Sequence, residues 1–126
     1  MKQIFIVVLT VIATVGCSSE PQYPGPFEYH AGIRDNLFKT AAVRGYLDGQ
    51  NKILKRCKRL WDNKNKYPSK KLAQEINRIK QTISFPDVSA TVIAGMTGGL
   101  VSVYELKQYH EEAIDYCVDV VEAVEG

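Results

Sequence analysis

The chain has few side chains of the kinds that hold transition metals. Its 126 residues include two histidines, His30 and His110, and three cysteines. Neither a C-x-x-C nor an H-x-x-x-H spacing occurs, although structural zinc sites usually draw their ligands from such pairs. We therefore expect no bound metal ion and no cofactor.

Motifs of the common enzyme classes are also missing. The sequence contains neither a glycine-rich phosphate loop nor a G-x-S-x-G elbow. His110 falls on an apolar stripe, where a partly buried histidine with satisfied hydrogen bonds is more typical than a catalytic base. Glu111, Glu112 and Asp115 could act as paired carboxylates, but acidic runs on a terminal helix usually form a solvated face. We expect a protein that is not an enzyme, with no catalytic residue and no small-molecule substrate.

The sequence has no internal repeat and no sustained strand-like alternation. Apolar or small residues instead recur every three or four positions, which predicts helices. The expected helices cover 33–63, 70–83 with Ser69 as N-cap, 88–97 and 101–123. The predicted fold class is all-α, a small bundle of about four helices.

Three of these segments carry a stripe that should face the core. The stripe of 70–83 is Leu72, Ile76, Ile79 and Ile83; that of 101–123 is Val103, Leu106, His110, Ala113, Cys117, Val120 and Val124; that of 33–63 is Phe38, Ala42, Gly45, Gly49, Ile53, Cys57 and Leu60. Gly45 and Gly49 each weaken a helix by about 1 kcal/mol relative to alanine, yet they would let another backbone approach closely. A break between two shorter helices is the alternative.

Residues 88–104 form a run of seventeen residues without a charge. Gly95 and Gly99 give it a G-x-x-x-G spacing, which membrane helices use where they pack closely. The run is short and rich in glycine for a membrane span. We expect a short buried helix followed by a turn at Gly98-Gly99, with membrane insertion as the alternative.

Charge is distributed unevenly along the chain. Residues 44–80 contain twelve Lys or Arg and three acidic residues, whereas residues 105–126 contain seven acidic residues and one lysine. The simplest expectation is that the basic and acidic elements face each other within the fold. A basic surface toward anionic lipid or lipopolysaccharide is the alternative, and nucleic acid is not an expected partner.

Aromatic residues are numerous for so small a domain. Tyrosine and tryptophan are enriched in recognition surfaces, because they bury a large area while keeping a polar group. Trp61, beside Arg59 and Lys64 at an expected helix end, is the candidate exposed anchor. The candidate binding residues for a protein partner are Tyr46, Arg59, Trp61 and Tyr67.

The N-terminus has the three parts of a secretory signal. Lys2 gives a short basic region, and residues 4–15 form an apolar stretch too short to span a bilayer. The sequence Val15-Gly16-Cys17 then resembles the lipobox of bacterial lipoproteins. The resemblance implies cleavage before Cys17, which then carries acyl lipid such as palmitate and anchors the protein to a membrane.

Ser18, rather than Asp, follows the cysteine, and in lipoproteins this implies sorting to the outer membrane with the domain facing the periplasm. Residues 18–26 contain three prolines and a glycine and should form an extended, unpacked tether. The expected organisation is a signal peptide at 1–16, a lipidated tether at 17–30 and a helical domain at 31–126. A soluble periplasmic protein, whose signal happens to end near a cysteine, is the alternative.

If Cys17 carries lipid, Cys57 and Cys117 remain as a pair in an oxidising compartment. A disulfide between them would close a loop of about 60 residues, which the chain-entropy model values at about 3–4 kcal/mol. Two buried free thiols or a metal site are the alternatives. Two straight helices bonded at these cysteines could not also cross at both glycine pairs, so either the glycines turn the chain or the disulfide does not form.

A second pattern spans residues 41–104. Gly45-Tyr46-Leu47-Asp48-Gly49, Cys57, Pro68-Ser69 and Pro86 together resemble the small periplasmic immunity proteins that neutralise cell-wall amidase toxins of type VI secretion. The resemblance implies a lipid-anchored helical protein that acts by binding a protein partner. A different class of function is the alternative: an envelope structural or exclusion lipoprotein, of plasmid or phage type, that acts through a basic surface.

Overall fold

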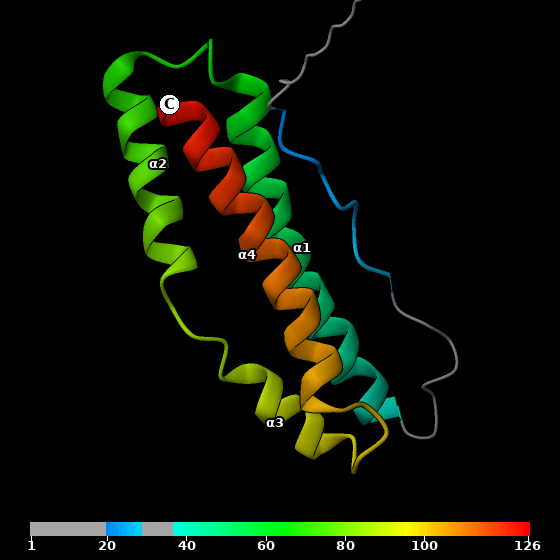
Figure 1. Ribbon diagram of the computed structural model, residues 1–126. Coiled ribbons are helices and arrows are strands. Elements are labelled where there is room, and N and C mark those ends of the chain that lie inside the picture. The colour runs from blue at the N-terminus through cyan, green and yellow to red at the C-terminus, as the bar shows by residue number, and fades with distance from the viewer. Residues whose placement is uncertain (1–19, 29–36) are drawn as a thin grey trace, which may run out of the picture.

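A computed structural model describes residues 20–28 and 37–126 of the chain (Figure 1). The signal, Cys17 and His30 lie outside the described residues. The described part contains four helices and no strand: α1 (Leu37–Asn63), α2 (Ser69–Ile83), α3 (Ser89–Met96) and α4 (Val103–Glu125). The predicted all-α class and the number of helices are confirmed.

Helix α1 runs without a break through both of its glycines. The predicted close approach of another backbone is wrong: Gly45 and Gly49 are exposed, and a Cβ built on either would meet no neighbouring atom within 4 Å. The physical reason is that the helix turns a different face inward. Cys57 and Leu60 are buried as expected. In the preceding part of α1, however, the buried positions are Val43, Tyr46, Leu47, Gln50 and Leu54.

Helix α2 buries the predicted stripe, with Ile79 fully inside and Leu72, Ile76 and Ile83 packed around it. The expected N-cap is wrong by one residue. Ser69 is already the first helical residue, Pro68 precedes it with φ −59°, and no side chain caps this end. Proline suits a position beside the first turn, because the amide hydrogen that it lacks would have no partner within the helix.

The predicted glycine turn is confirmed. After α3 ends, Gly98 and Gly99 both take positive φ, 64° and 93°, a conformation that glycine adopts without strain. The buried Thr97 hydroxyl holds the turn, donating to the Ala94 carbonyl at 2.7 Å and accepting from the Val101 amide at 3.2 Å. Gly98 and Gly99 therefore turn the chain, and the two helices that carry the cysteines, α1 and α4, can lie side by side.

Helix α4 begins with a capping box. Ser102 Oγ accepts from the Glu105 amide at 3.0 Å, and the Glu105 carboxylate accepts from the Ser102 amide at 3.2 Å. These reciprocal bonds satisfy two amide groups that a helix start leaves unpaired. The predicted stripe of this helix is confirmed, since Leu106, Ala113, Cys117 and Val120 are all buried.

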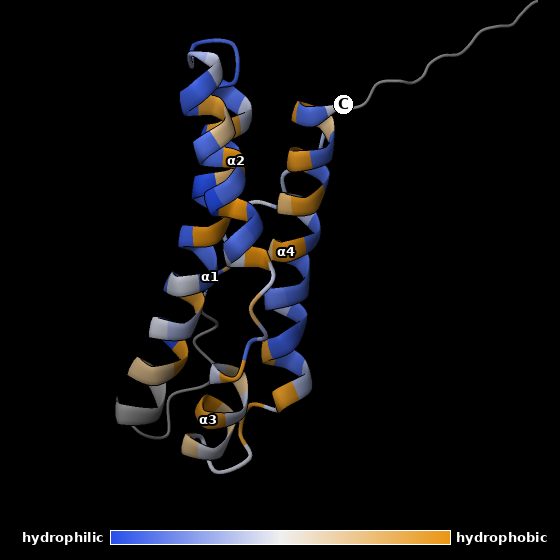
Figure 2. Ribbon diagram, turned by 90° about the vertical axis from the view of Figure 1, so that its left-hand side faces the viewer, coloured by the Kyte–Doolittle hydropathy of each residue, from blue (hydrophilic) through white to orange (hydrophobic). Residues whose placement is uncertain are grey.

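Helices α1 and α4 are parallel neighbours. The Cys57–Cys117 disulfide, the Gln50–His110 contact and the Tyr46–Leu106 hydrogen bond each join residues 60 positions apart. Helix α4 also packs against α2 and α3, and Figure 2 shows the hydrophobic stripes of the helices that meet in the interior. The core has two clusters, one around the disulfide and one between α3 and the first half of α1.

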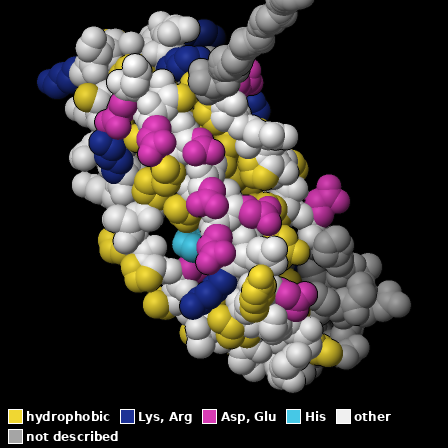
Figure 3. Space-filling view, in the orientation of Figure 1, with side chains coloured by type: hydrophobic (Ala, Val, Ile, Leu, Met, Phe, Trp, Pro, Cys, Tyr) yellow, Lys and Arg dark blue, Asp and Glu magenta, His cyan; other side chains and the backbone are white. Residues whose placement is uncertain are grey.

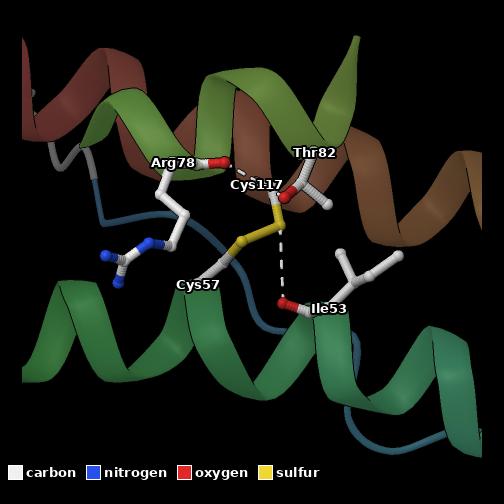
Figure 4. Close-up of a disulfide and its surroundings, with 5 residues drawn as sticks. All are labelled: Ile53, Cys57, Arg78, Thr82 and Cys117. Atoms are coloured by element: carbon white, nitrogen blue, oxygen red, sulfur yellow. Dashed lines mark hydrogen bonds between the residues drawn. A yellow bond between two sulfur atoms is a disulfide. The ribbon is translucent and has the colours of Figure 1, made fainter. Parts of the chain in front are cut away.

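The predicted disulfide is present and buried. The Cα atoms of Cys57 and Cys117 are 5.4 Å apart, and both residues are at most 1% exposed. Figure 4 shows α2 lying over the bond, with Thr82 nearby and its hydroxyl donating to the Arg78 carbonyl oxygen at 3.0 Å. The disulfide thus joins α1 to α4 beneath the cover of the third long helix.

Residues 20–28 form a strap along α1 and α4, so the expectation of an unpacked tether is wrong for this segment. Tyr23 packs edge-on against Tyr116 with ring centroids 5.4 Å apart, and the Phe27 ring lies 5.0 Å from that of Tyr109. Asn51 fixes the strap by accepting from the Phe27 amide at 2.7 Å and donating to its carbonyl at 2.9 Å. Both strap rings thus pack on α4, and Asn51 of α1 holds the backbone between the two helices.

Candidate functional site

Three of the four predicted binding residues lie at one end of the bundle. Arg59 and Trp61 belong to the last turns of α1, and Tyr67 follows in the loop to α2. Trp61 is half-buried rather than fully exposed and packs against the core around the disulfide. The Lys64 ammonium lies 3.8 Å from the centroid of the Trp61 ring, and that of Lys71 lies 5.7 Å from Tyr67.

Tyr46, the fourth predicted binding residue, is only 6% exposed. Its hydroxyl lies between two acceptors, the Leu106 carbonyl oxygen at 2.7 Å and a carboxylate oxygen of Asp87. Burial raises the pKa of Tyr46, and the hydrogen bond and charge of Asp87 raise it further. Tyr46 is therefore a core residue in this structure, and its ring is not available to a partner.

Asp87 joins Tyr46 to the start of α3. One carboxylate oxygen accepts from the Ser89 amide at 3.2 Å and from the Ser89 hydroxyl at 2.6 Å. Burial alone would raise the pKa of Asp87, but hydrogen bonds from Ser89 and Tyr46 and the nearby His110 outweigh it and lower the pKa below its usual value. The ionised form of Asp87 thus suits this position.

His110 completes this polar junction. Its Nδ1 lies 3.0 Å from Gln50 Oε1 and 3.5 Å from an Asp87 carboxylate oxygen, and its side chain is 17% exposed. The prediction that this histidine is partly buried is confirmed, and its Nδ1 has a hydrogen-bond partner. The junction ties α1, α4 and the start of α3 together. Within residues 20–28 and 37–126, no three His, Cys, Asp or Glu side chains lie close enough to share a metal ion.

The largest exposed apolar side chains gather around α3. Among the described residues, five large hydrophobic side chains are at least 45% exposed, and all belong to residues 85–104: Phe85, Val88, Val92, Leu100 and Tyr104. We call these five residues the α3 surface. Scattered exposed hydrophobic residues are common, but several in one region are typical of an interaction site. Figure 3 shows hydrophobic side chains at this end of the molecule.

The expectation that 88–97 forms a buried helix is therefore wrong for one of its faces. Ala90 and Ala94 face the core, at 0% and 7% exposure, while Val88 and Val92 are 71% and 60% exposed. Small residues at positions i and i+4 let α3 lie close to α1 and α4. The sequence indicated these two faces. Ala90 and Ala94 are four residues apart, and so are Val88 and Val92, which places each pair on one side of a helix. The expectation of a buried helix rested on the missing charge and on the run being short and rich in glycine for a membrane span, and neither property indicates the α3 surface.

The opposite end of the molecule is basic. Residues 58–71 contain six basic residues and Asp62, and we call the six the basic corner: Lys58, Arg59, Lys64, Lys66, Lys70 and Lys71. Arg59, Lys66 and Lys70 are exposed, and no ion pair joins them to another described residue. This corner comprises the end of α1, the loop and the start of α2.

The basic and acidic elements do not neutralise each other as predicted. Among the ion pairs between described residues, the one that joins residues 44–80 to α4 is Lys80–Glu125, at 2.7 Å. The acidic side chains of α4 instead form an exposed band along the side of the bundle (Figure 3). The reason is geometric: the face of α1 that meets α4 is apolar, so the lysines and arginines point outward.

None of the helices in the described ranges has both the length and the hydropathy of a transmembrane span. Comparisons of the chain with protein families, with curated proteins and with solved structures find no match.

Proposed function

We propose that the protein is a lipid-anchored helical module, facing the periplasm from the outer membrane, that binds a protein partner through the α3 surface. The observation that carries this proposal is the concentration of all five large exposed hydrophobic side chains of the described chain in residues 85–104. The signal and the lipobox-like Val15-Gly16-Cys17 support the anchor. A buried disulfide agrees with an oxidising compartment such as the periplasm.

The shape of the α3 surface indicates the chemistry of the partner. Val88 and Val92 are one helical turn apart and both exposed, which is the spacing with which a helix inserts side chains into an apolar groove. No charged residue lies between Val88 and Tyr104. The partner is therefore a protein with an apolar groove, and the resemblance of residues 41–104 to immunity proteins makes a cell-wall amidase toxin one such partner. The protein acts by binding and is not an enzyme.

The test is photo-crosslinking in cells through an unnatural side chain at position 104, where Tyr104 is 71% exposed. We expect an adduct with another protein, and we expect Val92→Asp to remove it, because a carboxylate would have to enter an apolar groove. The matched control is Ala73→Asp, on an exposed position of α2, which should leave the adduct unchanged. No adduct, or equal adduct with Val92→Asp, would contradict the proposal.

A second candidate function draws on the basic corner. An envelope structural or exclusion lipoprotein would act through Arg59, Lys66 and Lys70, whose charges are exposed. Such a protein should lose its partner as salt rises, because exposed charges are screened beyond about 8 Å at physiological ionic strength. Binding through the α3 surface should persist in salt, which separates the two candidates.

A further inference from the structure

The strap determines which end of the bundle lies beside the N-terminal anchor. Phe27 is held at Asn51, near the middle of α1, and the strap runs from there toward the end of α1 (Figure 1). At that end Glu20 and Tyr23 line a hollow of about 330 Å³ together with Lys58, Trp61 and Tyr116. Burial, helped by the charges of Asp62, Tyr23 and Glu20, raises the pKa of Tyr116 to about 12. The described chain thus starts next to the basic corner.

Covalent geometry then limits the distance between the anchor and this corner. Three peptide units separate Cys17 from Glu20, and an extended chain spans at most about 3.5 Å per residue, or about 10 Å in all. If the lipid on Cys17 is inserted in a bilayer, Glu20 lies within about 10 Å of the headgroups. This distance is comparable to the Debye length of about 8 Å at physiological salt, so a charge beside Glu20, such as that of Lys58 in the shared hollow, would act on the membrane.

The charges at this end favour contact with an anionic membrane. The corner itself has six basic residues and Asp62, while the same end also carries acidic residues of α4: Glu20 lines a second hollow with Asp119 and Glu122, and Glu125 pairs with Lys80. The acidic band on α4 lies along the side of the bundle and reaches this end (Figure 3). Contact with an anionic membrane is therefore favoured through the side of this end that the α1–α2 loop forms, and not through α4. Trp61 and Tyr67 add half-buried aromatic rings, and these residue types are enriched at the membrane–water interface.

We propose that the basic corner rests on the anionic phospholipid headgroups of the membrane that holds the Cys17 lipid, so that the bundle stands on this end. The inference depends on the proposed lipidation of Cys17. It also places the α3 surface away from the bilayer. Helix α3 packs against Val43 and Leu47, and the 20 residues from Val43 to Asn63 correspond to about 30 Å of helix. A partner would therefore meet the α3 surface at about that height above the membrane.

Trp61 is the one tryptophan of the chain and serves as a natural reporter. The full lipidated protein is placed in phosphatidylcholine vesicles with and without phosphatidylglycerol, each carrying a spin-labelled headgroup that quenches nearby tryptophan. We expect strong quenching with phosphatidylglycerol and a loss of quenching without it. Raising the salt to about 0.5 M, where the Debye length is about 4 Å, should have the same effect.

Two sets of variants test the orientation. The triple variant Arg59→Glu, Lys66→Glu, Lys70→Glu should lose the quenching. Its matched control, Lys52→Glu, Lys55→Glu, Lys107→Glu, changes the net charge equally at exposed positions outside the corner and should keep it. A tryptophan moved to the α3 surface, as Trp61→Phe with Val92→Trp, should stay unquenched.

The outcomes separate this inference from the proposed function. An acylated, vesicle-bound protein whose Trp61 is unquenched, or is quenched equally in both triple variants, overturns the inference and leaves the anchor and the α3 surface intact. A mature protein whose mass shows no acyl group on Cys17 overturns the anchor and this inference together. A corner that crosslinks to another protein in cells, with Trp61 unquenched by phosphatidylglycerol, assigns the basic corner to a protein partner instead.

Discussion

The two ends of the bundle differ in what holds them together and in what they expose. The end with the basic corner contains the larger core cluster, which the disulfide between Cys57 and Cys117 joins covalently. The α3 end is held by the smaller core cluster, to which α3 contributes Ala90 and Ala94, by a glycine turn and by the hydrogen bonds of Asp87. The comparison shows that the disulfide and the cluster of basic residues lie at the same end, where the described chain starts. The end that we assign to a partner exposes apolar side chains and is positioned by a smaller apolar cluster and by hydrogen bonds, without a covalent cross-link among its described residues.

Removal of the disulfide should have the largest effect on stability. Cys57→Ala with Cys117→Ala should lower the free energy of unfolding by about 3–4 kcal/mol, because the unfolded chain loses a 60-residue loop constraint. Denaturant unfolding of the variant and the native protein measures this difference. Amide hydrogen exchange should increase more in the second half of α1 than in α3. A uniform increase would mean that the two ends are not distinct.

Removal of the buried Tyr46 hydroxyl should have the second-largest effect on stability. Tyr46→Phe leaves the Leu106 carbonyl and the Asp87 carboxylate without this donor, which should cost about 1–3 kcal/mol because both acceptors are shielded from water. The control is Tyr104→Phe, at 71% exposure, which should change stability by less than about 0.5 kcal/mol. Equal effects in thermal unfolding would show that the Tyr46 hydroxyl makes no such contribution.

A substitution of Asn51 tests how the strap is held on the bundle. Asn51→Ala removes both hydrogen bonds to the Phe27 backbone, each worth about 0.5–1.5 kcal/mol net, so we expect a loss of about 1–3 kcal/mol in the free energy of unfolding. Chymotrypsin should also cleave the variant faster after Phe27, since the strap leaves the bundle more often. Unchanged cleavage would show that the ring contacts alone hold the strap.

The smallest effect concerns pH. The pKa of Asp87 is lowered in the folded protein, so its contribution to stability is complete above the ordinary aspartate pKa of about 4 and is lost as the pH falls through the folded value. We expect the native protein to lose about 1 kcal/mol, the scale of one net hydrogen bond, through this group in that acid range. The variant Asp87→Asn should lack this component. Parallel acid titrations of both proteins that superimpose would refute the prediction.

Local patterns in the sequence predicted most of the fold. The stripes of α2 and α4 were predicted correctly because their apolar residues are large and evenly spaced. Ser102 and Glu105 form a capping box at the S-x-x-E spacing, which is a further local signal for the start of α4. The disulfide followed from cysteines on two predicted core stripes.

Features that depend on distant contacts were not predictable in the same way. Tyr46 was predicted to be a binding residue from its residue type. Its partners, Asp87 and Leu106, lie 41 and 60 residues away, so no local pattern indicated that its hydroxyl is buried. Small residues gave a false signal in α1, since Gly45 and Gly49 resembled a packing face and are exposed. The prolines of the strap correctly excluded a helix but gave no indication that Tyr23 and Phe27 would pack on the bundle.

The difference between the two ends is tested most directly by crosslinking from both in the same cells. One protein carries the photoreactive side chain at position 66, in the basic corner, and a second carries it at position 92, on the α3 surface. Both positions are exposed. We predict a protein adduct from position 92 and none from position 66, which should react with phospholipid. A protein adduct from position 66 and none from position 92 would contradict the assignment of the two ends.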